Sequence, residues 1–255
     1  MQLTDTHCHL ADSALLGSLP QVLAAARAAG VCRFIVPATQ RGDFADVAAL
    51  SALPSVHIAF GIHPWFADAA AESDFADLEQ WLAQHPQALA GEIGLDYGRA
   101  QTQEQRLRQV AVFERQLVLA QRLRRPVIIH NLKATAAVVR SVKNCRFTQG
   151  GIAHAFSGSL EEARALTGCG FKIGIGSLLL NPAARKARRA AAELPPEDIV
   201  LETDSPFMLK NTVNTPANVR EIAVITAQLR GIAPEEVAAQ TERNVNALLE
   251  KVGGF

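Results

Sequence analysis

The sequence has no excess charge of either sign, because 25 Lys and Arg residues balance 25 Asp and Glu residues. A net charge of zero argues against a broad basic surface that coats duplex nucleic acid. A small substrate, or a nucleic-acid end held by a few local contacts, is compatible with this balance.

Cysteine is also scarce. The four cysteines are scattered and form no Cys-x-x-Cys pair: Cys8, Cys32, Cys145 and Cys169. The sequence shows no secretory signal pattern and no apolar run long enough to span a bilayer. We therefore expect a reduced, cytoplasmic setting in which the cysteines are buried structural residues. A zinc site that uses two of the thiols is the alternative.

The sequence does have a large apolar fraction, 49% of 255 residues, in a regular alternation of short apolar runs and amphipathic stretches. The runs are apolar throughout, as in parallel strands that are buried on both faces. We expect strands at 3–9, 34–36, 56–60, 88–92, 126–130, 151–154, 171–175 and 199–204. Eight such units predict one (β/α)8 barrel domain of the TIM type over residues 1–255, with helices at its C-terminus. A doubly wound open sheet is the alternative fold.

The first expected strand ends in a His-x-His pair, His7 and His9. Alternate side chains of a strand share a face, so both imidazoles point the same way and Cys8 points the other way. Two neighbouring imidazoles can hold two corners of one metal ion. A motif this short also occurs as a pair of ordinary histidines.

Other ligand-type residues recur at the ends of later expected strands: Glu92, His130, His154 and Asp204. Barrel enzymes build their active sites at the C-terminal ends of their strands. A buried carboxylate without a partner costs several kcal/mol, and a bound cation removes that cost. The pattern therefore predicts a metal site at this end of the barrel.

Several blocks of sequence occur in order almost from end to end of the chain. They are Asp5-Thr6-His7-Cys8-His9, Gly61-Ile62-His63-Pro64, Gly91-Glu92-Ile93-Gly94-Leu95-Asp96-Tyr97, Pro126-Val127-Ile128-Ile129-His130, His154-Ala155-Phe156-Ser157-Gly158, Leu201-Glu202-Thr203-Asp204-Ser205-Pro206, Asn214-Thr215-Pro216 and Asn244-Val245-Asn246-Ala247-Leu248. Taken as an ordered set, these blocks resemble the signature of the TatD family. The resemblance implies a metal-dependent hydrolase on an amidohydrolase-type barrel, in a family many of whose members are deoxyribonucleases.

The resemblance implies two divalent ions held by six side chains: His7, His9 and Asp204 on one ion, His130 and His154 on the other, and Glu92 bridging them. Four imidazoles and two carboxylates are indeed too many for one tetrahedral ion with an open position. Two ions about 4 Å apart clamp the attacking and leaving oxygens of a displacement. Asp204 is expected to accept the proton of the attacking water, and Glu92 to be the second catalytic carboxylate. Zinc, magnesium, manganese, nickel and cobalt all remain candidates for the ions.

Further residues are expected around this centre. Asp5 and Glu202 lie one step deeper in their strands than two of the ligands, where we expect them to accept hydrogen bonds that orient the ligand imidazoles. Plain buried hydrogen bonding is the alternative for both. His63 heads toward the same rim and is expected to contact substrate or to cap a loop, with metal ligation as a further alternative. Trp65 and Phe66 are candidates for stacking a base or for packing a lid.

One departure from the family pattern bears on the substrate. Family members commonly carry His-x-Arg where this chain has His130-Asn131-Leu132, so an arginine that could contact phosphate is missing. Lys133 is the candidate replacement. We expect a deoxyribonuclease that acts on single-stranded DNA or strand ends. The alternative is a hydrolase of carboxylic esters or amides, such as an aminoacyl-tRNA ester, and the complete ligand set argues against a silent binding module.

Overall fold

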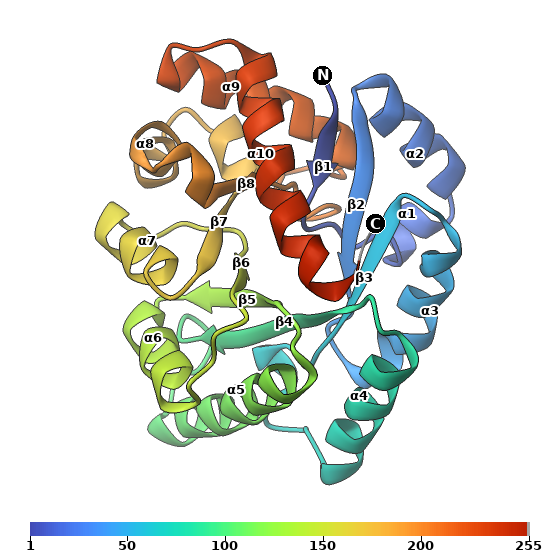
Figure 1. Cartoon of the computed structure of the whole chain (residues 1–255), viewed down its shortest axis with the longest axis vertical. Helices are drawn as coiled ribbons and strands as arrows, with labels where there is room; N and C mark the ends of the chain where they lie inside the picture. The colour runs from blue at the N-terminus through green and yellow to red at the C-terminus, as the bar shows by residue number, and fades with distance from the viewer. Residues whose placement is uncertain (254–255) are drawn as a thin grey trace.

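The computed structural model describes residues 1–253, and within this range eight parallel strands form one sheet in the order β1 to β8 (Figure 1). Hydrophobic residues fill both faces of most strands, as expected for parallel strands covered by helices. The strands are β1 (Leu3–Asp5), β2 (Val31–Pro37), β3 (Val56–Phe60), β4 (Leu89–Asp96), β5 (Val127–Leu132), β6 (Gly151–Ala153), β7 (Phe171–Ile175) and β8 (Ile199–Leu201).

The sheet curls until its last strand lies beside its first. The Thr6 backbone N–H donates to the Leu201 carbonyl at 3.0 Å, and just beyond the strands Cys8 and Ser205 form a parallel bridge. The predicted (β/α)8 barrel is therefore confirmed, and the open sheet is excluded.

Helices surround the sheet, as Figure 1 shows. Their starts follow the capping rules: Thr102 and Ser159 accept hydrogen bonds from the backbone of the first turn of α5 and α7, and Gln105 and Glu162 bond back. The helices are α1 (Ser13–Leu16), α2 (Leu19–Ala28), α3 (Phe44–Ala49), α4 (Glu72–Gln84), α5 (Gln103–Leu123), α6 (Thr135–Asn144), α7 (Leu160–Thr167), α8 (Arg185–Glu193), α9 (Val219–Arg230) and α10 (Pro234–Leu249). Among residues 1–253, none of them has both the length and the hydrophobicity needed to cross a bilayer.

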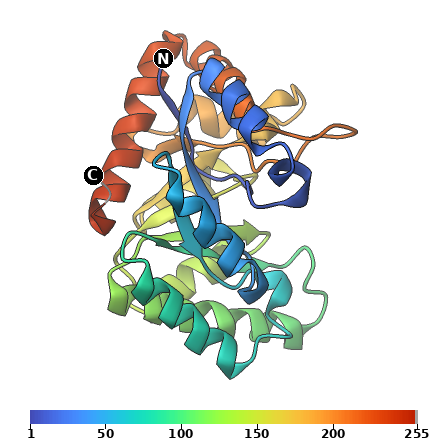
Figure 2. The same ribbon diagram turned by 90° about the vertical axis from the view of Figure 1, so that its right-hand side faces the viewer.

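Helix α10 closes one end of the barrel. Its apolar residues Val245, Leu248 and Leu249 join a core cluster with one inward-facing residue from each of six strands: Ile35, Ala59, Leu89, Ile128, Ile152 and Val200. Figures 1 and 2 show the helix lying across this end, while the loop after β8 projects on the opposite side. The end that receives the C-terminal ends of the strands is left for the functional site.

Some element boundaries differ from those expected. Strand β1 ends at Asp5, because the Asp5 carboxylate accepts the backbone N–H of His7 at 3.2 Å and turns the chain. His7 therefore follows the strand. Strand β4 continues to Asp96, since its pairing with β5 extends to Leu132, and Glu92 lies inside it. The short helix α1 was not expected.

We predict that Asn244→Ala weakens the closed end of the barrel. The Asn244 amide is buried and donates to the carbonyls of Pro196 and Ile199, at 2.8 and 2.7 Å. Removing the donor leaves two carbonyls short of a partner, which costs about 1–3 kcal/mol of unfolding free energy. Thermal denaturation should show Tm lower by roughly 2–4 °C for each kcal/mol. Arg243→Ala, an exposed neighbour on the same helix, is the matched control, and an equal loss in both variants would contradict the prediction.

Candidate metal centre

His7 and His9 meet Asp204 where β1 and β8 end. The Nε2 atoms of the two imidazoles lie 3.2 Å apart. Asp204 Oδ1 is 3.6 Å from Nε2 of His7 and 3.3 Å from Nε2 of His9. One atom from each of the three side chains therefore faces a common point, and all three atoms lie within 4.8 Å of one another. The predicted first group of ligands is brought together.

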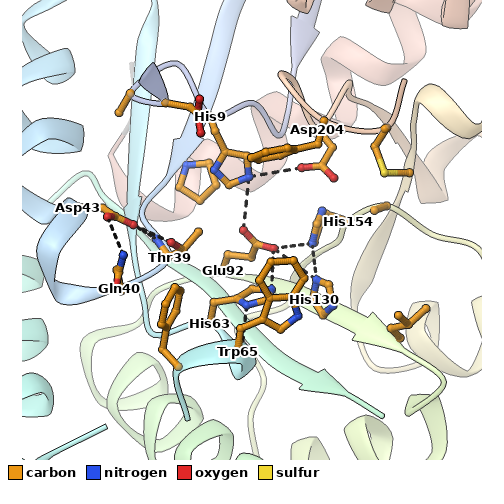
Figure 3. Close-up of a pocket in the computed structure, with 18 of the residues that line it drawn as sticks. His9, Thr39, Gln40, Asp43, His63, Trp65, Glu92, His130, His154 and Asp204 are labelled. Carbon is orange, nitrogen blue, oxygen red and sulfur yellow. Dashed lines mark hydrogen bonds and ion pairs between the residues drawn. The ribbon is translucent and has the colours of Figure 1, made fainter. Parts of the chain in front are cut away.

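Glu92 lies between two sets of imidazoles (Figure 3). Its Oε2 is 3.4 Å from His7 Nε2 and 3.6 Å from His9 Nε2. Its Oε1 is 2.9 Å from His154 Nε2 and 3.4 Å from His130 Nδ1. One carboxylate therefore joins both groups, which is the position that a bridging ligand needs.

His63 enters this centre from the loop after β3. Its Nε2 is 3.3 Å from Glu92 Oε1, and its ring lies edge-on to the ring of His130 with centroids 4.4 Å apart. His63, Glu92 and His130 form a set whose ligand atoms are mutually close enough for a metal ion. His63 also accepts the backbone N–H of Trp65 through Nδ1, at 3.2 Å. The sequence left substrate contact, loop capping and metal ligation open for His63, and the structure shows the capping bond together with proximity to Glu92 and His130.

The donor set fits a cation. Glu92 is 4% exposed, and within the described residues its Oε2 accepts no hydrogen bond of proper geometry. Burying a carboxylate is costly unless positive charge compensates it. A divalent ion between the Glu92 oxygens and the Nε2 atoms of His7 and His154 that face them would supply that charge.

The protonation of the centre is set by burial and by the packing of carboxylates against imidazoles. Burial, helped by the neighbouring His154, lowers the pKa of His7 to about 4, so this ring is neutral at neutral pH. Burial alone would raise the pKa of Glu92, but the imidazoles around it, His154 foremost, hold that pKa well below its usual range. The pKa of Asp204 is lowered in the same way by the His9 and His7 imidazoles, against the opposing effect of burial. Neutral imidazole and ionised carboxylate are the forms that bind metal.

Asp96 fixes the orientation of His130. Its Oδ2 lies 3.3 Å from His130 Nε2 and accepts the indole N–H of Trp65 at 2.7 Å, while Oδ1 accepts the backbone N–H of Arg99 at 2.9 Å. This arrangement turns Nδ1 of His130 toward Glu92. Burial opposes protonation of His130, but the Asp96 and Glu92 carboxylates outweigh it and raise its pKa to about 9. The contact between Asp96 and His130 joins the neighbouring strands β4 and β5.

Asp5 and Glu202 support the ligands through the main chain. Asp5 accepts the backbone N–H of Thr203 at 2.9 Å and its hydroxyl at 2.5 Å, besides the N–H of His7. Glu202 accepts the backbone N–H of Ala155, next to His154. Burial raises the pKa of Asp5 to about 7 and that of Glu202 well above its usual value. This corrects the expectation that they orient imidazole rings, because in the described residues neither carboxylate has a hydrogen bond from an imidazole nitrogen.

A cavity of about 660 Å³ opens onto the centre, and His9, His63, Glu92, His130 and Asp204 are among the residues that line it. Leu132, two residues after His130 in β5, lines it as well. Lys133 does not: it is exposed and has a left-handed backbone conformation with φ 55°, which turns it away from the strand. The structure thus brings the six predicted ligands and His63 together, but leaves Lys133 outside.

Other cavity residues had no clear sequence signal. Thr39 and Asp43, which are joined by a hydrogen bond of 2.6 Å, follow β2, and Phe207 and Met208 follow β8. Each group lies just after the C-terminal end of a strand, and this position is the one signal that could have indicated them.

Comparison with known proteins agrees with this geometry. The family model of TatD-related DNases matches residues 4–250. An Escherichia coli protein described as an uncharacterized metal-dependent hydrolase, YjjV, is 33% identical over 251 residues and 96% of each chain. The 3'-5' ssDNA/RNA exonuclease TatD of Edwardsiella piscicida is 30% identical over 258 residues, 96% of this chain and 98% of that one. The crystal structure of E. coli YjjV, described as a TatD homologue, superposes with a TM-score of 0.89 at 31% identity, over 96% of this chain and 97% of that one.

The ligand-type residues at the strand ends and the family match over almost the whole chain lead to one conclusion: the chain belongs to the TatD family of metal-dependent hydrolases.

Proposed function

We propose that this protein is a deoxyribonuclease that cuts phosphodiester bonds with the help of two divalent ions. His7, His9 and Asp204 would hold one ion, His130 and His154 the other. The observation that carries the proposal is the position of Glu92, whose two carboxylate oxygens face the two groups separately. His63 is close enough to Glu92 to join the second group, and we assign it to substrate contact because it also lines the cavity.

The side chains of the centre divide the chemistry between them. When bound, two divalent ions acidify a water molecule and neutralise charge on the scissile phosphate. Asp204 lines the cavity and is held in its ionised form, so it can accept the proton of that water. Glu92 contacts both groups of proposed ligands and so connects them. Asp96 and the main-chain contacts of Asp5 hold the ligands in place, which is what a preorganised site requires.

DNA as substrate is supported by the relatives. The protein from E. piscicida is named for single-stranded DNA and RNA, and a mouse relative of 31% identity is named as a putative deoxyribonuclease. The net charge of zero favours strand ends or single strands over long duplex contacts. Zinc, magnesium, manganese, nickel and cobalt all suit the mixed nitrogen and oxygen donors, so the metal is to be found by supplementation.

The metal centre predicts a stoichiometry and a loss of turnover. Metal-loaded protein should contain close to two divalent ions per chain by elemental analysis. Glu92→Ala removes the bridging position, so it should lower metal content and abolish nearly all cleavage of single-stranded DNA. Full activity after exhaustive chelation, or in the Glu92→Ala protein, would refute the two-ion site.

Binding through a few local contacts predicts a shallow salt dependence. Each phosphate contact to a single strand adds about 0.7 to the slope of log K against log salt, so a few contacts give a slope of only a few units. Degradation should favour linear single strands over closed circles of the same sequence. A steep slope together with rapid cutting of circles would contradict binding at ends.

Leu132 supplies a test of the substrate. An arginine here could bond a phosphate, and a hydrogen bond to a charged group is worth about 1.5–3 kcal/mol, or roughly ten- to hundredfold in rate when it is made in the transition state. We expect Leu132→Arg to raise kcat/KM on single-stranded DNA with metal content unchanged, and Leu132→Met to change little. On an uncharged carboxylic ester the arginine should bring no gain. A Leu132→Arg protein that keeps its metals but loses DNA cleavage would show that no phosphate passes this position.

A further inference from the structure

The cavity beside the metal centre is poor in positive charge. None of the described residues that line it is Lys or Arg, although Asp12, Asp43 and Asp46 line it in addition to the carboxylates of the centre. The basic residues of α8 are not among the residues that line the cavity: Arg185, Lys186, Arg188 and Arg189. The described lining residues therefore offer no cationic side chain to a phosphate, and the nearest positive charges are the metal centre and the Arg99 guanidinium behind the cavity-lining Trp65.

The wall is instead apolar, and part of it is aromatic. Of the large hydrophobic side chains that are exposed in the described residues, Trp65, Phe207 and Met208 all line this cavity, at 51, 50 and 39% exposure. Leu132 and Leu178 continue the same surface. Exposed apolar side chains gathered at one concave place indicate a binding site for an apolar ligand.

Trp65 is held in a fixed orientation there. Its indole N–H donates to Asp96 Oδ2 at 2.7 Å, and the Arg99 guanidinium lies over its ring, 4.5 Å from the centroid. Its ring also stands perpendicular to that of His63, with centroids 5.0 Å apart. About half of the side chain is still exposed to the cavity. A rigid, half-exposed indole offers a planar ligand a stacking surface at low entropic cost.

A second aromatic side chain lies across the metal centre from Trp65. Phe207 packs edge-to-face on His9, with centroids 5.5 Å apart. Figure 3 shows His9 and Asp204 on one side of Glu92 and Trp65 on the other. The two exposed aromatics thus flank the carboxylate that would bridge the ions, and a planar group bound against either one lies next to the reacting bond.

Building on the proposed function, we propose that this cavity binds the base of the nucleotide at the strand end being cut, and that Trp65 is the residue that stacks on it. The base is uncharged and planar, so it suits a wall without Lys or Arg. The scissile phosphate is then the one charged group of the substrate that the centre itself must hold. Trp65 becomes a specificity-determining residue, since it selects for a substrate that carries an aromatic ring beside the scissile bond.

The test compares two single-stranded oligonucleotides with the same phosphates. One carries a normal base at each terminal nucleotide, and the other replaces the terminal base at the 3' or the 5' end by an abasic tetrahydrofuran residue. Metal-loaded protein should cut the normal end with kcat/KM about five- to 150-fold higher, the range expected for stacking one base on an aromatic side chain. Trp65→Phe should keep most of this ratio, and Trp65→Ala should bring it close to one.

The ratio separates stacking from a structural role of Trp65. Both variants lose the indole N–H that bonds Asp96, so a role limited to that bond would slow both oligonucleotides equally and leave the ratio unchanged in both variants, which would overturn the proposal. Leu107→Ala, an exposed hydrophobic residue on α5 outside the cavity, is the control and should keep the ratio of the unaltered protein.

Failure of the subsite can be told from failure of the proposed function. Equal cutting of normal and abasic ends by the unaltered protein would refute the base subsite and leave the nuclease in place. No cutting of either oligonucleotide by fully metal-loaded protein would refute the nuclease activity, and the base subsite with it.

Discussion

The structure of the functional end depends on one buried charge, the Glu92 carboxylate. It is ionised although almost no water reaches it, because imidazoles from other strands surround both of its oxygens. A buried carboxylate is tolerated only where positive charge or donors compensate it. His7 is neutral under the same burial, so its ring alone cannot supply that charge. The raised pKa of His130 shows that a protonated imidazole can balance part of this charge, and divalent cations would take over that role once the imidazoles act as neutral ligands.

Hydrogen bonds from backbone N–H groups to two buried carboxylates hold the parts of the chain around this centre together. Asp5 connects the residue after β1 to Thr203 after β8, where the barrel closes, and Glu202 connects the same loop to Ala155 after β6. Both carboxylates are buried and accept hydrogen bonds. Burial raises their pKa values, because it disfavours the ionised form of each group. The rigid frame fixes where Asp204 and His154 can point. Precision of this kind is what allows ligands from distant parts of the sequence to share one ion.

The fold, and the side chains that gather at the functional end, could be predicted because they follow from local patterns. Continuous apolar runs indicate parallel strands, and a polar residue after such a run falls at the functional end of a barrel. Contacts across the barrel could not be predicted in this way. The Asp5 carboxylate, for example, also accepts the hydroxyl of Thr203, which lies 198 residues away in the sequence. His63 and Phe207 lie in loops, whose paths no periodic pattern describes. Lys133 follows a strand as expected, but its left-handed φ turns it outward.

In the proposed activity, positive charge would lie at the metal centre, while the described residues of the cavity wall include no Lys or Arg. A nuclease that binds along the phosphate backbone needs a continuous basic surface, and neither the net charge of zero nor the cavity provides one. Under the proposed function, positive charge is concentrated at the ions, where it acts on one phosphate. No Lys or Arg among the described lining residues shares that phosphate with the ions. Leu132 and Trp65 form an apolar surface of the cavity, which can bind a base but offers no hydrogen bond to a phosphate. Attraction to the substrate and selection of the bond to be cut are then made by different groups, which are connected through the contacts of Asp96 with Trp65 and His130.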